Sequence, residues 1–314
     1  MEKAVARQRA PRDERRARVG KWCRWNIPCY LFLSPFLIGF FLFTLYPIVA
    51  SLCYSFMDYN GVVIFDIGLF NWEELFSTGP GGLWEGVSRS FGLTFGYALL
   101  SIPLNMVLSY TLALVLHKKL KGIRFLRLLC YLPVLIPSIV FGQIWRDMLA
   151  YPNGLINQWL TALGLPSNTF YDGEGTQFWT LLITAQWGIG GGMIMWLAAL
   201  NNIPGTLYES ARLDGAGYFR CLFRITLPMS TPIIFYNLIS AIIACLQTFD
   251  TYSYVGRGVN DGMYFVSVRV YVTAFVEKSF GMACAVAWLL FIVIACLTAL
   301  TFKTSKWVFY GEDS

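Results

Sequence analysis

Few residues of this chain have the type and spacing that catalysis or metal binding requires. The only histidine, His117, has no second metal-binding side chain near it in the sequence, and no two of the eight cysteines form a CxxC pair. No GxxxxGK[ST] segment is present, so the chain lacks the loop that holds the phosphates of ATP. The sequence therefore predicts a protein without catalytic residues and without a metal or cofactor of its own.

Neutral polar side chains and glycines lie within two otherwise apolar stretches, 186–192 and 237–251. Glycines in the first stretch would let a ligand approach the backbone. The second stretch ends with the ionisable residue Asp250, at the edge of a segment that is later predicted to span a membrane. The candidate ligand contacts are Gln186, Trp187, Gly188, Gly190, Asn237, Gln247, Thr248, Asp250 and Thr251. Two structural roles also fit the pattern: close helix packing for the glycines, and hydrogen bonds between helices for Asn237 and Gln247. Asp250 could equally be solvated outside the membrane.

The polar loop at 201–228 has the sequence of two short helices joined by a turn. Pro204 can open a helix that continues through residues 208–213. Gly215 follows where this helix would end, because glycine tolerates a positive φ. A second amphipathic stretch covers residues 218–225, in which one face would hold Phe219, Leu222, Phe223 and Ile225. Such a loop could dock into a groove of a partner, or it could be a linker that only positions the next helix.

The helices that position these polar groups must form from long runs of residues without charge. Asp, Glu, Lys and Arg make up 13% of the chain, against roughly 25% in soluble proteins. This excludes an ordinary cytosolic enzyme, a disordered protein and a nucleic-acid-binding domain. About 20 apolar residues cross a bilayer as a helix, so six runs predict spans at 29–55, 90–116, 126–149, 178–200, 229–250 and 283–303. The run 148–171 is interrupted by prolines and a glycine and is expected to form a short helix at the interface.

The basic residues are distributed unevenly between the two sides of these spans. Of 24 Lys and Arg residues, 19 lie in the two tails and in the connections after the second and fourth spans. Cytoplasmic segments carry this excess, so both termini are predicted to be cytoplasmic. The expected organisation is a basic tail at 1–27, a membrane domain at 28–305 and a short tail at 306–314. The basic tail is expected to fix the topology; binding of anionic lipid or nucleic acid is the alternative.

The 201–228 loop resembles the EAA loop of ABC importer permeases. The residues that carry the resemblance are Glu209-Ser210-Ala211, Gly215 and Ile225-Thr226-Leu227-Pro228. The family spacing is EAA, three residues, G, nine residues and I-x-L-P, and the loop fits it without a gap. Asp214-Gly215-Ala216 also matches the DGA that is common there. Ser210 replaces the first alanine, which exchanges one small residue for another.

Further segments are similar to the carbohydrate-uptake permeases related to the larger membrane subunit of the maltose system. They span residues 30–305 and include the first span, Asn71-Trp72, Arg124-Phe125, YLPVLIP at 131–137, GLINQWLTALGL at 154–165 and Phe249-Asp250. One departure is GRGVN at 256–260, where the family has a TxGGP turn, so the outer turn toward a binding protein is expected to differ in shape. Residues 56–89 are too few for the large outer domain of the maltose subunit.

This resemblance implies an all-α type I ABC importer permease with six spans and a cytoplasmic coupling helix, located in the bacterial cytoplasmic membrane. It implies a second permease subunit, two ATPase subunits that hold ATP and magnesium, an extracytoplasmic binding protein and surrounding lipid, with no nucleic acid. The residues expected to contact an ATPase are Glu209, Ser210, Ala211, Asp214, Gly215, Ala216, Phe219, Leu222, Leu227 and Pro228. Glu209 would make charged contacts, while Ala211 and Gly215 would allow a close approach.

The function that the resemblance implies is passage of a sugar or oligosaccharide, with sugar contacts in the two polar stretches. Glycerol-3-phosphate or another polar metabolite is the alternative within the family, although Lys and Arg are scarce in the spans. A secondary transporter is disfavoured, since the spans lack the buried ionisable residues that couple transport to ions and show no inverted repeat. Polar span residues weakly disfavour a membrane anchor without a substrate path.

Overall fold

The computed structural model describes residues 28–78, 82–118, 121–173, 175–249 and 263–308. The chain divides into two units, residues 1–54 and 55–314. In the described ranges, three helices are each long and apolar enough to cross a membrane, and three bent helix pairs raise the number to six if each pair is one span. The six spans expected from the charge-free runs therefore correspond to six helical segments.

The first unit is helical from Pro28 to Tyr54. Its helix contains a π-turn, η1 (Phe41–Leu45), and continues as α2 (Tyr46–Tyr54). No side chain of η1 or α2 is buried, although nearly all of them are apolar. A helix with this composition and exposure is stable where lipid or an apolar protein surface surrounds it.

The second unit begins with a small hairpin that the all-α expectation did not include. Strands β1 (Met57–Tyr59) and β2 (Ile64–Ile67) pair antiparallel, and helix α3 (Phe70–Leu75) follows. The buried Asn71 side chain donates hydrogen bonds to the carbonyl oxygens of Ser55 (3.1 Å) and Met57 (2.8 Å). Asn71 therefore fastens α3 to the start of the hairpin.

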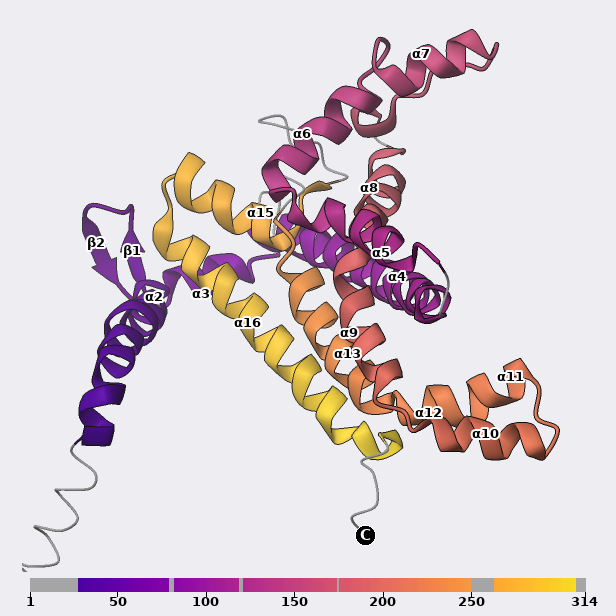
Figure 1. Cartoon of the computed structure of the whole chain (residues 1–314). Coiled ribbons are helices and arrows are strands. Elements are labelled where there is room, and N and C mark those ends of the chain that lie inside the picture. Colours follow the sequence, from indigo (N-terminus) through magenta and orange to yellow (C-terminus); the bar gives the residue numbers. More distant parts are fainter. Residues whose placement is uncertain (1–27, 79–81, 119–120, 174, 250–262, 309–314) are drawn as a thin grey trace, which may run out of the picture. The chain divides into compact units, whose positions relative to one another are not determined.

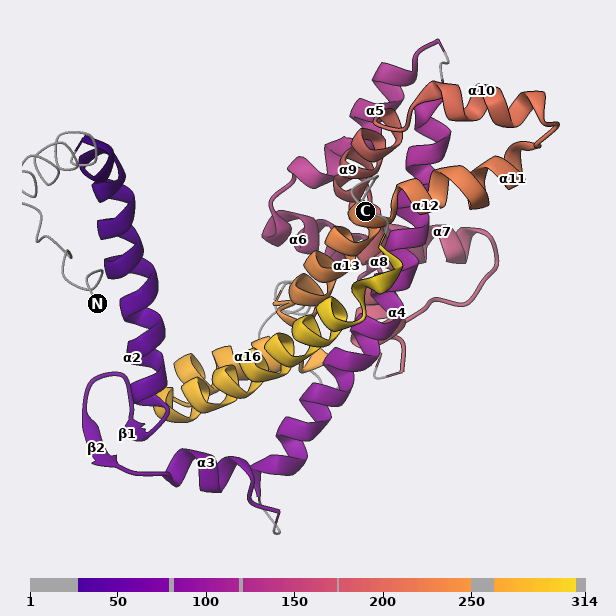
Figure 2. The same ribbon diagram turned by 90° about the horizontal axis from the view of Figure 1, so that it is seen from below.

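Four long helices form the bundle of this unit: α4 (Leu83–His117), α9 (Gly190–Asn201), α13 (Thr231–Leu246) and α16 (Phe280–Lys303). Helix α4 packs against α9 and α13, and α13 packs against α16 (Figures 1 and 2). One buried apolar cluster joins α4, α13 and α16, and another joins the end of α4 to α9. After α16 the chain ends its described part with the short turn η8 (Ser305–Trp307).

The third span, expected as one helix over 126–149, is broken. Helix α5 (Ile123–Tyr131) and the 3-10 turn η2 (Leu132–Leu135) meet α6 (Ser138–Leu149) at 94°. Pro137 excludes the residue before it from the α conformation, and Ile136 is accordingly extended, with ψ 126°. The span expected over 126–149 is therefore present as a bent pair of helices and not as one continuous helix.

The fourth span is also bent, and a bend precedes the fifth. Helix α8 (Gln177–Ala185) and the 3-10 turn η4 (Gln186–Gly188) meet α9 at 47°, and glycines on both sides of Ile189 make this stretch a weak helix former. Helix α13, which forms the fifth span, meets the preceding helical segment Tyr218–Met229 at 65°, and it ends at Leu246, four residues before the expected boundary.

Shorter helices connect these spans. Helix α7 (Leu155–Ala162) confirms the short helix expected within 148–171, and the 3-10 turn η3 (Phe170–Asp172) precedes α8. Helix α15 (Val266–Tyr271) and its π-turn η7 (Val272–Val276) were not expected from the sequence. Two hydrogen bonds fasten α15 to α4: Val266 N–H to Thr94 Oγ1 (3.1 Å) and Arg269 Nε to Ser90 Oγ (3.0 Å).

Candidate functional site

The coupling hairpin, residues 205–229, contains α10 (Gly205–Leu213), α11 (Tyr218–Cys221), the π-turn η5 (Leu222–Thr226) and α12 (Leu227–Met229). Helix α10 begins directly after Pro204, as expected. Figures 1 and 2 both show α10 and α11 running side by side beyond the ends of α9 and α13. The sequence prediction of two short helices joined by a turn is confirmed.

Gly215 makes the turn of this hairpin. Its φ is +75°, the left-handed region that glycine enters without steric cost. The N–H groups of Gly215 and Ala216 donate to the carbonyl oxygens of Arg212 (3.0 Å) and Ala211 (2.8 Å), the pattern of a Schellman cap. An added Cβ at Gly215 would meet no atom within 4 Å, so within this chain the backbone conformation, rather than space, calls for glycine.

A side-chain hydrogen bond that the sequence did not reveal holds the two legs together. The hydroxyl groups of Tyr208 on α10 and Thr226 on η5 are 2.9 Å apart. Thr226 is buried and Tyr208 is partly buried, so this bond is partly shielded from water. Because 18 residues separate the two positions, only the folded hairpin shows that they are partners.

From Thr226 a series of contacts continues into the bundle. The Ser230 hydroxyl donates to the Thr226 carbonyl oxygen (2.7 Å), and the Tyr110 hydroxyl on α4 donates to Ser230 Oγ at 3.4 Å. The Tyr110 ring packs edge-on against Trp196 of α9, with centroids 5.1 Å apart. Trp196 in turn donates from Nε1 to Ser109 Oγ (2.9 Å). Hairpin, α4, α9 and the start of α13 are thus mechanically connected.

The motif residues lie largely on the outside of the hairpin. Exposed positions are Glu209, Ser210, Asp214, Gly215, Phe219 and Leu227, and partly buried ones are Ala211, Ala216, Leu222 and Pro228. The Ser210 hydroxyl donates back to the Thr206 carbonyl oxygen (3.0 Å), so the serine that replaces alanine leaves no unsatisfied donor on this surface. The motif residues are therefore accessible to another protein.

The expectation that four apolar residues of the second helix share one face is wrong. Phe219 and Phe223 are 71% and 63% exposed, whereas Leu222 and Ile225 are partly buried. The π-turn η5 adds a residue to this turn and changes the spacing of side chains around the helix. The two phenylalanines form a separate exposed apolar surface, and Leu222 and Ile225 face the rest of this unit.

A groove of about 630 Å³ lies between the hairpin and the end of α4. Its lining includes His117 and Lys118 at the end of α4, and Glu209 and Arg212 on α10. The Lys118 ammonium lies 6.0 Å from the centre of the Tyr218 ring, within reach of a weak cation–π attraction. The groove lies between the outer part of the hairpin and the bundle. The hairpin is therefore attached to the bundle mainly at the end where it joins α9 and α13.

The first polar stretch is only partly available to a ligand. Gln186 accepts a hydrogen bond from Asn105 of α4 (3.4 Å) and donates to the Leu182 carbonyl oxygen (3.0 Å). Trp187 and Gly188 are exposed, and the Trp187 ring packs edge-on against Trp145 at 5.5 Å. Asn105 is a polar residue in an apolar span, but it was not among the ligand contacts expected from the sequence.

Gly190 has the packing role that the sequence left open. It is buried, and an added Cβ would overlap the carbonyl oxygen of Cys130 on α5. Asn237 donates to the Ile233 carbonyl oxygen of its own helix (3.0 Å), so its hydrogen bond lies within α13 and does not join two helices. Among the described residues, no hydrogen bond joins Gln186 with Asn237 or Gln247.

The second polar stretch is described only to residue 249. Gln247 is exposed at the end of α13, and the Thr248 hydroxyl donates to the Ala244 carbonyl oxygen (3.3 Å). Asp250, Thr251 and the GRGVN turn at 256–260 lie outside the described residues. In the part of the chain that the structure covers, no three His, Cys, Asp or Glu side chains are grouped to hold a metal ion.

Comparison with known proteins accounts for most of the chain. Residues 105–306 match the family described as Binding-protein-dependent transport system inner membrane component. The chain is 36% identical over 295 residues to the probable ABC transporter permease protein YesP of Bacillus subtilis (strain 168), covering 91% of this chain and 93% of that protein. It is 28% identical over 291 residues to the arabinooligosaccharides transport system permease protein AraP of the same organism, covering 90% of each.

The fold is also that of a solved transporter. The crystal structure of a bacterial ABC transporter involved in the import of the acidic polysaccharide alginate contains a chain that superposes with a TM-score of 0.83. The superposition covers 93% of this chain and 100% of that chain, at 22% sequence identity. The helical arrangement expected from the sequence, that of a type I ABC importer permease, is confirmed.

Proposed function

We propose, from the premise that this chain belongs to the binding-protein-dependent transport system inner membrane components, that it is a permease subunit passing a sugar or oligosaccharide across the cytoplasmic membrane. The observation that carries the proposal is the coupling hairpin, whose motif residues are exposed at fixed spacing on a rigid turn. The chain itself performs no chemistry; it supplies the membrane path.

Two observations support a sugar as the transported substrate: the name of a similar protein, and the lack of charged residues in two of the spans. AraP, which matches this chain nearly end to end, is named for arabinooligosaccharide transport. Between residues 175 and 208, and again between 225 and 249, the chain carries no ionised residue. Neutral amide and indole groups suit a neutral, hydroxyl-rich substrate, because each sugar hydroxyl can both donate and accept a hydrogen bond.

The proposed assembly has four further components. A second, similar permease completes the path, two ATPase subunits bind ATP and magnesium, and an extracytoplasmic binding protein delivers the sugar. The absence of a GxxxxGK[ST] segment from the sequence supports an external source of energy. The excess of Lys and Arg on the hairpin side supports an orientation with both termini and the hairpin in the cytoplasm.

Coupling in this proposal is mechanical. An ATPase subunit contacts Glu209, Asp214 and the turn at Gly215, and its closure on ATP displaces the hairpin. The Tyr208–Thr226 bond makes the two legs move together, and the contacts from Ser230 through Tyr110 to Trp196 carry the displacement to α4 and α9. The path then opens to the other side of the membrane. The exposed residues Phe219 and Phe223 supply an apolar contact for the ATPase.

Reconstitution of the complete complex tests the proposal. Proteoliposomes containing this chain, its partner permease and the ATPases are supplied with internal ATP, external binding protein and a radiolabelled arabino-oligosaccharide or malto-oligosaccharide. We expect uptake that requires ATP, and we expect Gly215→Asp or Glu209→Lys to reduce it at least tenfold while the complex stays folded. Undiminished ATP-coupled uptake with both variants would remove the hairpin from the mechanism, and uptake that follows an ion gradient without ATP would contradict the importer itself.

A further inference from the structure

A second pocket lies at the opposite end of the bundle from the coupling hairpin. Its volume is about 180 Å³, and it is formed by α3, the start of α4, α15 with η7, and the start of α16. The far end of α4 lines the hairpin groove, so the 35 residues of this helix separate the two sites. The two sites therefore lie near opposite membrane surfaces.

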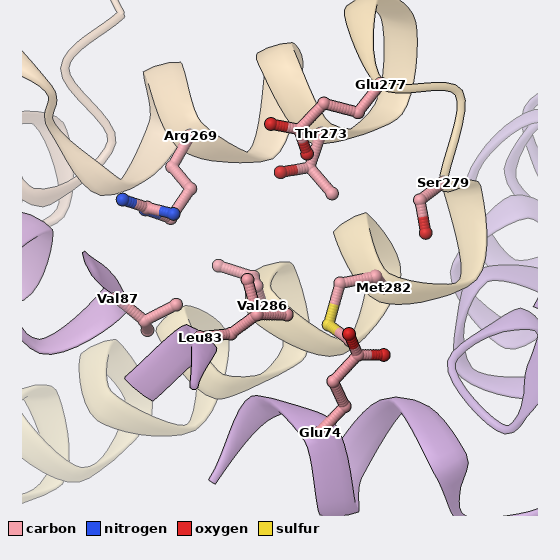
Figure 3. Close-up of a pocket in the computed structure, with 9 residues that line it drawn as sticks. All are labelled: Glu74, Leu83, Val87, Arg269, Thr273, Glu277, Ser279, Met282 and Val286. Carbon is pink, nitrogen blue, oxygen red and sulfur yellow. The ribbon is translucent and has the colours of Figure 1, made fainter. Parts of the chain in front are cut away.

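The polar groups of this pocket comprise acceptors and donors on different walls. Glu277, Thr273 and Ser279 line one wall, and Glu74 faces them from α3 across the pocket (Figure 3). Arg269 lies at another side, where its guanidinium is 4.7 Å from the Tyr264 ring centre and donates to Ser90. Carboxylates accept hydrogen bonds, a guanidinium only donates them, and hydroxyls do both.

One of these polar groups, the Thr273 hydroxyl, has no hydrogen-bond partner among the described residues. Thr273 is 5% exposed, and its side chain points from η7 toward the pocket (Figure 3). In an ordinary helical turn a threonine hydroxyl bonds to the carbonyl oxygen four residues earlier, as Thr301 does here, but Thr273 lies in the π-turn and makes no side-chain hydrogen bond to any described residue. The hydroxyl oxygen is not among the fully enclosed, unpartnered polar atoms of the described residues, so it is accessible from the pocket and available to a polar ligand there.

The balance of charge selects the class of ligand. A cation would be attracted by Glu74 and Glu277 but repelled by Arg269, and an anion would be repelled by both carboxylates. We propose that this pocket binds one ring of a neutral sugar, whose hydroxyls donate to Glu74 and Glu277 and accept from Thr273 and Arg269. This inference deepens the proposed function, because it adds a sugar contact at the membrane surface away from the hairpin.

The rest of the lining fits the same ligand. Leu83, Val87, Met282 and Val286 form an apolar floor between the polar walls. A sugar ring presents C–H groups on one face and hydroxyls around its edge, so the face can rest on this floor while the edge meets the polar groups. The volume of about 180 Å³ admits a single ring, and the rest of an oligosaccharide would extend outside.

Direct binding tests the inference without requiring transport. The complete complex in lipid nanodiscs, without ATP or binding protein, is titrated with D-glucose, D-galactose and L-arabinose and followed by saturation-transfer NMR. We expect at least one of these sugars to bind, and Thr273→Val and Glu74→Gln each to weaken its affinity about tenfold, as expected for one lost hydrogen bond to the ligand. Thr273→Ser keeps the hydroxyl, and Glu73→Gln changes a neighbouring carboxylate outside the pocket; both should bind like the unaltered protein.

Three outcomes would overturn the proposal. Affinity that is the same in Thr273→Val, Glu74→Gln and the unaltered protein would place any sugar binding elsewhere, and binding of none of the three sugars would leave the pocket without this ligand. Tighter binding of n-butylammonium than of every sugar, lost in Glu74→Gln, would identify a site for a cationic side chain instead. Because sugar binding is read without uptake, failure of the transport function and failure of this site are separate results.

Discussion

At the scale of single residues, the hydroxyl of Tyr208 holds the two legs of the hairpin together by its hydrogen bond to Thr226. Tyr208→Phe removes the 2.9 Å bond to Thr226 and leaves the packing of the ring unchanged. The loss is worth about 1 kcal/mol, too little to unfold the protein but enough to let the two legs move separately. We expect the reconstituted complex to keep its ATPase activity while sugar uptake per ATP falls several-fold.

Tyr218→Phe is the matched control, because Tyr218 also lies in the hairpin but its described contacts, with Phe219 and Lys118, involve the ring. It should retain the full ratio of uptake to hydrolysis. If both variants lower this ratio equally, the effect comes from the aromatic surface and not from the Tyr208–Thr226 bond.

Substitutions of two nearby glycines distinguish a role in helix packing from a position that is open to a ligand. Gly190→Ala places a Cβ against the Cys130 carbonyl oxygen, whereas Gly188→Ala meets no atom within 4 Å. Overpacking of this kind typically costs about 1–3 kcal/mol. Thermal unfolding in detergent should therefore show a lower Tm for Gly190→Ala and an unchanged Tm for Gly188→Ala. Equal melting temperatures would contradict the close contact between α9 and α5.

At the scale of elements, α15 donates two hydrogen bonds to side chains of α4 that hold it in place. Thr94→Val leaves the buried N–H of Val266 without an acceptor, which costs about 1–3 kcal/mol locally. We expect hydrogen–deuterium exchange to accelerate in residues 266–271 of this variant, with little change in α16. Thr94→Ser retains the hydroxyl and should exchange like the unaltered protein. Unchanged exchange in Thr94→Val would show that the Arg269–Ser90 bond suffices to hold the helix.

The elements also show what a single sequence can reveal. The start and turn of the hairpin were predictable because Pro204 and Gly215 act on the backbone within a few residues. The angles between broken helices were not, since a 94° bend at Pro137 depends on what both halves pack against. Helix α15 and its π-turn were missed because they are short and Arg269 interrupts their apolar character.

At the scale of the whole molecule, charge predicts the orientation. In a variant without the native cysteines, Thr78→Cys lies between α3 and α4, and Thr206→Cys lies on the hairpin; both positions are exposed. The excess of basic residues on the hairpin side predicts a cytoplasmic hairpin. In intact cells a membrane-impermeant maleimide should label position 78 only, and position 206 should react after permeabilisation. Labelling in the reverse order would invert the topology.

The whole molecule likewise limits what could be foreseen of the substrate path. The polar residues were visible in the sequence, but their partners were not: Gln186 binds Asn105 from a helix 81 residues away. Gly190 looked as available to a ligand as Gly188, and only the position of α5 distinguishes them. The residue types in the sequence indicate which positions can contact a ligand. The packing of helices that are distant in the sequence determines which of these positions remain accessible to it.

The π-turn at Leu222–Thr226 has a genetic consequence. Because a π-turn contains one residue more than an α-helical turn, loss of a single codon there could restore an unbroken α-helix. Both kinds of turn carry the chain once round the helix axis, so the side chains before and after this place would keep their faces. Loss of one residue from the regular helix α13 would instead rotate all the following side chains by about 100°. A single-codon deletion should therefore be tolerated better within 222–226 than within α13.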